Sequence, residues 1–198
     1  LNGLYEALTS HGYNVISKAS NGIEALQLIL EHHPTLAILD VEMPYLSGFE
    51  VVKKVKEKKG DTKFIMQTLH KTTDYIELAL ALKIEGYLLK EDSFEEIESC
   101  IKTVLANETF FSNSIENSAL LNATKEFGKL KILTPSEMVI LKLISQQSTT
   151  KDIASSLHVS IRTIEKHRSN IIEKLDLKGE SNSLTLWAIK HTSTILSF

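Results

Sequence analysis

The first half of the chain alternates between short apolar runs and longer segments with helical periodicity. No other feature of the sequence constrains the fold as strongly. The run Leu36–Leu39 is apolar throughout and leads directly into Asp40, and Pro44 follows four residues later. Apolar runs bounded by turn residues are typical of strands buried on both faces, and strands separated by helices indicate βα units around a parallel sheet. We therefore predict a doubly wound parallel-sheet α/β fold for this half.

The expected elements follow one another from residue 1 to residue 106. The predicted strands are Val15–Ala19, Leu36–Leu39, Phe64–Thr68 and Gly86–Leu89. A helix is expected over Leu1–Ser10, and the other predicted helices begin at Ser20, Ser47–Gly48, Asp74 and Ser93. Ser93 is followed three residues later by Glu96, which is the spacing of a capping box.

The second half shows helical patterns without strand patterns. The Asn/Ser-rich stretch 107–131 has weak periodicity and is predicted to be a linker that is partly helical. Helix starts are predicted at Thr134 with Pro135 and Glu137, at Thr149 with Asp152, at Ser160, and at Ser181 or Asn182. We therefore expect a domain over residues 1–110, a linker over 111–131 and a small all-α domain of four helices over 132–198.

Charge is distributed unevenly between the two halves. Residues 1–113 carry 11 basic against 17 acidic side chains, a net of −6, whereas residues 114–198 carry 11 against 8, a net of +3. An acidic half followed by a basic half indicates two domains, the second of which faces a polyanion. The single cysteine, Cys100, cannot form an internal disulfide, and no apolar stretch is long enough to span a bilayer. We expect a cytoplasmic protein without membrane contact.

Three polar residues stand at the carboxyl ends of predicted strands, namely Asp40, Thr68 and Lys90. In a doubly wound sheet these ends border the ligand crevice, so the three side chains are expected to converge there. A carboxylate, a hydroxyl and an ammonium group suit transient phosphoryl chemistry. The carboxylate is the nucleophile that becomes an acyl phosphate, and the hydroxyl, the ammonium group and a divalent metal neutralise the developing charge.

The stretches "LAILDVEMPYLSG", "IMQT" and "GYLLK" resemble the receiver domain of two-component response regulators, and "GYLLKED" resembles the NarL/FixJ subfamily. The resemblance implies a flavodoxin-like fold in which Asp40 accepts phosphate from a sensor histidine kinase and Thr68 and Lys90 bind the phosphoryl group. It also implies that Asp40 and the backbone carbonyl of Glu42 bind Mg²⁺. Tyr87 would be the aromatic residue whose rotamer follows Thr68.

One departure from the family concerns the beginning of the chain. Receivers begin with a central strand that ends in a pair of acidic residues, and these complete the magnesium site. The sequence before the helix at Leu1–Ser10 supplies neither the strand nor the pair. Because neighbouring strands would lose their central partner, we expect that this strand lies upstream of Leu1 in the native chain. Mg²⁺ binding is predicted only if the pair exists there; otherwise the domain is a pseudo-receiver.

Residues 149–175, "TTKDIASSLHVSIRTIEKHRSNIIEKL", predict two helices joined by a short turn, as in a helix-turn-helix. Ile164, Ile171 and Leu175 form the expected buried stripe of the second helix. The polar face suits a DNA major groove, although a solvated amphipathic helix has the same charge pattern. Predicted base contacts are Glu165, Lys166 and Ser169, and predicted phosphate contacts are Arg162, Thr163, Arg168 and Lys174.

The stretches "LTPSEMVILKLI" and "KDIASSLHVSIRTIEKHRSNIIEKLDL" resemble a LuxR-type DNA-binding domain over residues 132 to about 192. This resemblance implies a homodimer on DNA that is formed through the last helix, Ser181–Thr192, whose apolar residues are equally compatible with plain core. We therefore predict a phosphorylation-regulated transcription regulator that is not an enzyme. Two alternatives stay open: a regulator independent of phosphorylation, and an aspartate-nucleophile phosphatase. Such a phosphatase needs a second aspartate where Glu42 stands.

Overall fold

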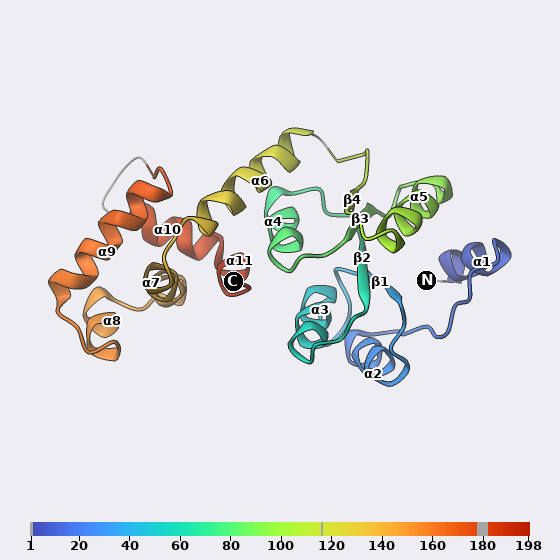
Figure 1. Cartoon of the computed structure of the whole chain (residues 1–198), viewed down its shortest axis with the longest axis horizontal. Helices are drawn as coiled ribbons and strands as arrows, with labels where there is room; N and C mark the ends of the chain where they lie inside the picture. The colour runs from blue at the N-terminus through green and yellow to red at the C-terminus, as the bar shows by residue number, and fades with distance from the viewer. Residues whose placement is uncertain (1, 116, 178–181) are drawn as a thin grey trace. The chain divides into compact units, whose positions relative to one another are not determined.

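The computed structural model describes residues 2–115, 117–177 and 182–198, and the chain divides into two compact units (Figure 1). The sheet unit comprises Leu1–Lys71 and Leu82–Asn117, and the helical unit comprises Thr72–Ala81 and Ser118–Phe198. The helical unit therefore includes α4 (Thr73–Ala81), although the sequence places this helix between two strands of the sheet.

The sheet unit is built on four parallel strands in the order β1-β2-β3-β4, which are Leu36–Asp40, Lys63–Thr68, Gly86–Leu89 and Phe110–Phe111 (Figure 1). Asp40 lies opposite Gln67, and Thr68 lies opposite Leu89. Because all strands run in the same direction, their carboxyl ends share one edge of the sheet. The predicted parallel α/β architecture is confirmed.

The helices of the sheet unit are α1 (Asn2–Ser10), α2 (Gly22–His32), α3 (Gly48–Glu57) and α5 (Phe94–Leu105). α3 begins with a complete capping box between Ser47 and Glu50. The N-cap of α2 was predicted one residue early, at Ser20: Asn21 caps the helix, because its side chain accepts from the backbone N–H of Glu24. The capping box predicted for α5 is incomplete, because the Glu96 carboxylate accepts from the backbone of Asn113.

The strand predicted at Val15–Ala19 is wrong. This segment has no strand pairing, and β1 is the edge strand of the described sheet. Both the segment and β1 line a cavity of about 1030 Å³ in the sheet unit. A strand requires a neighbour for its backbone N–H and C=O groups, and within the described residues no segment pairs with Val15–Ala19.

The helical unit contains α4 together with α6 (Asn117–Lys131), α7 (Pro135–Ser145), α8 (Thr150–Ser156), α9 (Ile161–Lys174), α10 (Ser183–Lys190) and the short α11 (Thr192–Ile195). Ile164, Ile171 and Leu175 are fully buried, which confirms the predicted stripe. The stretch predicted as a linker is largely helical, and its Leu130 joins the core of this unit.

The helix starts predicted at Thr134 and Thr149 are confirmed, and each forms a capping box. Asn182 is the N-cap of α10 but forms no cap hydrogen bond, and Ser181 lies outside the described residues. The predicted last helix is divided in two, because α10 ends before His191 and α11 begins after it. The all-α character predicted for this part of the chain is therefore confirmed, with one further short helix.

Glu137 connects two helices of the helical unit. Its carboxylate accepts from the backbone N–H of Thr134 at 2.8 Å and pairs with Lys174 Nζ at 2.7 Å, and its side chain is 4% exposed. Burial by itself raises the pKa of Glu137. The bonds from Lys174 and Thr134 outweigh burial and hold the pKa below its ordinary value of 4.5.

We expect Glu137→Gln to destabilise the helical unit at neutral pH by about 2 kcal/mol, the typical contribution of a hydrogen bond to a charged group. A lowered folded-state pKa stabilises the fold above the unfolded pKa, and this stabilisation is lost as pH falls through the folded-state value. The difference in melting temperature from wild type should therefore shrink as pH falls below 4.5 and through the folded-state pKa. Circular dichroism melts across pH test this. The control is Glu173→Gln, an exposed change of equal charge on α9; a constant difference would contradict the assignment.

Candidate functional site

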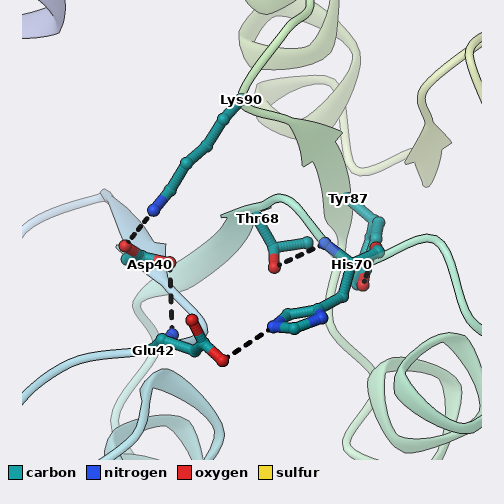
Figure 2. Close-up of polar contacts among 6 residues, drawn as sticks. All are labelled: Asp40, Glu42, Thr68, His70, Tyr87 and Lys90. Carbon is teal, nitrogen blue, oxygen red and sulfur yellow. Dashed lines mark hydrogen bonds and ion pairs between the residues drawn. The ribbon is translucent and has the colours of Figure 1, made fainter.

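Asp40 ends β1 and lies beside the side chain of Lys90, which follows β3 (Figure 2). Asp40 Oδ2 is 2.5 Å from Lys90 Nζ, and Asp40 Oδ1 accepts from the backbone N–H of Glu42 at 3.1 Å. The Asp40 side chain is 31% exposed. The shared carboxyl edge of parallel strands thus brings two of the three predicted residues into contact, and solvent still reaches the carboxylate.

Thr68 ends β2 at the same edge, but its hydroxyl forms no hydrogen bond with Asp40 or Lys90 in the described structure. Its Oγ1 instead accepts from the backbone N–H of His70 at 3.1 Å, and the residue is 1% exposed (Figure 2). A threonine hydroxyl is both a donor and an acceptor, so the hydrogen of Thr68 is not used in this bond. Its backbone carbonyl accepts from the N–H of Lys90 at 2.8 Å.

His70 links the remaining residues of the site and was missed in the sequence. Its Nε2 lies 2.9 Å from Glu42 Oε1, and its backbone carbonyl accepts from the hydroxyl of the fully buried Tyr87 at 3.0 Å (Figure 2). Together with its N–H bond to Thr68, His70 contacts three site residues. The sequence offers one indication of this role, namely that His70 follows the end of a strand by two residues. That indication is weak, because most loop residues at such positions are solvated.

The oxygen donors beside Asp40 are too few to form a Mg²⁺ site by themselves. Asp40 supplies one carboxylate, which already bonds Lys90. The second predicted ligand, the backbone carbonyl of Glu42, is uncharged, and the Glu42 carboxylate is engaged by His70. No group of three metal-ligating side chains includes Asp40 in the described residues. Mg²⁺ requires octahedral oxygen ligation that usually includes one or two carboxylates. The described residues do not by themselves fit a bound Mg²⁺ ion.

Gly48 sets the distance between the first turn of α3 and the end of β1. Its N–H donates to the carbonyl of Val41 at 3.0 Å. A Cβ at this position would lie 2.3 Å from the carbonyl oxygen of Asp40 and 2.5 Å from Met66 Cε. The absence of a side chain therefore allows the backbone of the site residue to approach the helix.

In the helical unit, α8 and α9 form the predicted helix-turn-helix. The turn contains no glycine, and His158 adopts the left-handed conformation that glycine usually supplies, with a φ of 55°. Five of the predicted DNA contacts lie on the exposed face of α9: Arg162, Thr163, Glu165, Lys166 and Ser169. All of them except Ser169 stand in the N-terminal half of the helix, where major-groove recognition places base contacts.

The other two predicted DNA contacts are bonded to side chains of other helices. Arg168 donates to Thr185 Oγ1 at 3.2 Å, and Lys174 pairs with Glu137. Of the apolar residues considered for a dimer interface, Leu184 and Ala188 are fully buried in the core, and Trp187 packs against that core. Five of the predicted contacts are thus exposed on α9, whereas Arg168 and Lys174 also hold α9 to other helices.

Known protein families match both halves of the sequence. Residues 1–102 match the response regulator receiver domain, and residues 131–186 match the bacterial regulatory proteins of the luxR family. The chain belongs to the response-regulator family. It is 33% identical over 189 residues to the oxygen regulatory protein NreC of Staphylococcus epidermidis RP62A, an alignment that covers 89% of this chain and 85% of the relative.

Two solved structures are similar to this response regulator. The receiver domain of the putative response regulator NarL from Mycobacterium tuberculosis is 30% identical, with a TM-score of 0.52, and the match covers 54% of this chain and 87% of that one. RcsB of Salmonella enterica serovar Typhimurium, bound to the rprA promoter, has a TM-score of 0.58 at 20% identity. That match covers 99% of this chain and 92% of RcsB, and it shows a shared fold.

The predicted family and class of function are confirmed: the protein is a response regulator that acts as a DNA-binding transcription regulator. It combines a receiver with a LuxR-type helix-turn-helix. Among the helices of the described residues, none has the length and apolar character needed to cross a membrane.

Proposed function

We propose that phosphorylation of Asp40 by a sensor histidine kinase switches this response regulator. The supporting observation is the Asp40 carboxylate, which is held at 2.5 Å by the Lys90 ammonium group and remains 31% exposed. One carboxylate oxygen attacks the phosphorus of the donor, an acyl phosphate forms, and the leaving group takes the electrons of the broken bond. Lys90 neutralises the charge that develops on the phosphoryl oxygens. Mg²⁺ takes part only if further carboxylates complete its ligand set.

The hydrogen bonds that connect Thr68, His70 and Tyr87 support a way for phosphorylation of Asp40 to change the conformation around Tyr87. Thr68 donates its free hydroxyl hydrogen to a phosphoryl oxygen and moves toward it. This movement weakens the bond from the His70 N–H, and His70 also holds the Tyr87 hydroxyl through its carbonyl. The phosphoryl group thus favours a second conformation of the loop and of Tyr87, which is a shift in population between two states.

The exposed face of α9 supports binding in the major groove of DNA. Glu165, Lys166 and Ser169 contact bases, and the neighbouring basic residues contact phosphates. A homodimer places its two recognition helices about 34–36 Å apart, which corresponds to half-sites one helical turn apart. We propose residues 1–110, 111–131 and 132–198 as the receiver, the linker and the DNA-binding domain in this mechanism.

The test is incubation of the full chain with acetyl phosphate, with and without Mg²⁺, followed by intact mass and DNA binding. The DNA is a duplex selected by this protein from a random-sequence pool. We expect a labile gain of one phosphoryl group and tighter binding of the duplex. DNA binding without any phosphoryl gain, and unchanged by the donor, would instead support a regulator that works independently of phosphorylation.

Lys166→Ala is expected to weaken binding to the selected duplex by roughly 10- to 100-fold, because one good contact to a base edge contributes about 1–3 kcal/mol of discrimination. Binding to a scrambled duplex should change much less. Fluorescence anisotropy at fixed salt measures both affinities. Lys125→Ala, which removes an exposed lysine of α6, is the matched control. If both variants lost affinity equally for both duplexes, Lys166 would contribute only general positive charge and no base contact.

A further inference from the structure

A cluster of metal-ligating side chains lies in the helical unit, where α4 and α11 are side by side (Figure 1). Asp74 and Glu77 stand one turn apart on α4, and His191 stands between α10 and α11. One oxygen of each carboxylate and one imidazole nitrogen lie within 4.8 Å of one another. Within the described residues this is the one group of three such side chains.

One oxygen of the cluster is buried without a partner. Glu77 Oε2 lies 2.7 Å from His191 Nδ1, and the two side chains are 1% and 6% exposed. Glu77 Oε1 is also buried and has no hydrogen-bond partner among the described residues. A buried carboxylate oxygen without a partner carries a desolvation cost, and a bound cation offsets that cost.

The other two groups are suited to complete a metal site. The ring of His191 stacks on Trp187, with centroids 4.4 Å apart and an interplanar angle of 27°, so its orientation is fixed. Asp74 is exposed, forms no hydrogen bond or ion pair among the described residues, and is free to change rotamer. It therefore provides both a third ligand and access from solvent.

We propose that Asp74, Glu77 and His191 bind a divalent transition-metal ion of the zinc type. Metal–nitrogen and metal–oxygen bonds of about 2.0–2.2 Å place tetrahedral ligands about 3.4 Å apart. Metal binding therefore replaces the 2.7 Å hydrogen bond between Glu77 and His191, whose proton is released to solvent, and a rotation of Asp74 brings in the third ligand. An imidazole beside two carboxylates favours zinc-like ions, whereas Mg²⁺ and Ca²⁺ prefer oxygen ligands alone. The fourth position is open to water. Bound metal links α4 to the α10–α11 junction, and this binding requires no phosphorylation of Asp40.

The probe is Co²⁺, added to the metal-free, unphosphorylated full chain. We expect one equivalent to give the visible absorption of a tetrahedral site, and we expect Zn²⁺, but not Mg²⁺, to displace it. Asp74→Ala and His191→Ala should each weaken Co²⁺ binding by more than tenfold, since even the outer hydrogen-bond partners of metal ligands contribute about 10–100-fold. The matched controls, Asp61→Ala and His32→Ala, remove an exposed carboxylate and an exposed imidazole elsewhere and should leave the affinity unchanged.

Asp74→Ala decides the outcome, because Asp74 is exposed and its loss leaves the buried core intact; circular dichroism verifies the fold. Unchanged Co²⁺ affinity in this variant would overturn the proposal. A loss in His32→Ala as large as that in His191→Ala would overturn it as well, since the binding would then belong to surface histidines. The result is also independent of the phosphorylation switch, because no phosphodonor is present.

Discussion

Asp40→Asn is expected to reduce phosphorylation by acetyl phosphate to below about 1% of the wild-type level, because a neutral amide does not act as the nucleophile that forms an acyl phosphate. The substitution keeps the shape of the side chain, and the amide oxygen can still accept from the N–H of Glu42. The fold should therefore remain, while the increase in DNA affinity caused by the phosphodonor is lost. Intact mass and fluorescence anisotropy measure the two effects on the same sample.

Two further variants test whether phosphorylation depends on Asp40 and Lys90 in particular. Asp61→Asn removes an exposed carboxylate from a loop and should be phosphorylated like wild type. Lys90→Ala retains the nucleophile but removes the ammonium group at 2.5 Å, so phosphorylation should be slower rather than absent. Full labelling of Asp40→Asn would show that another residue accepts the phosphoryl group, and the neighbouring Glu42 would be the first to examine.

Gly48→Ala is expected to destabilise the sheet unit by about 3 kcal/mol, the upper part of the range for overpacking a tight contact. Its Cβ would lie 2.3 Å from the carbonyl oxygen of Asp40, and backbone atoms cannot move aside as a flexible side chain does. Relief of the overlap must displace either the first turn of α3 or the end of β1. Either displacement moves Asp40, so slower phosphorylation should accompany the loss of stability.

The control for Gly48→Ala is Gly3→Ala in α1 of the same unit, where an added Cβ has no heavy atom within 4 Å. Alanine is the better helix former by about 1 kcal/mol, so this variant should be as stable as wild type or slightly more stable. Denaturant unfolding followed by circular dichroism compares the two. If Gly48→Ala matched Gly3→Ala in stability, the close approach of α3 to Asp40 would not constrain the site.

The features that were predicted correctly depend on neighbours close in the sequence. The capping boxes at Thr134 and Thr149 involve residues three positions apart, and the buried stripe of α9 repeats with the period of the helix. The placement of Asp40 beside Lys90 was also within reach, because parallel strands with known directions share their carboxyl ends. These rules need no knowledge of which distant segment packs where.

The sequence by itself determined the family, the strands β1, β2 and β3 with the helices between them, and the residue types at the carboxyl edge of the sheet. Tertiary structure alone decided that residues 13–19 form no strand, that His70 joins Glu42, Thr68 and Tyr87, and that α4 packs in the helical unit with His191 beside Glu77. The physical reason is the separation along the chain between the groups that interact. Caps and periodic faces are local, whereas a ladder partner or the partner of a buried charge is supplied by segments far away in the chain.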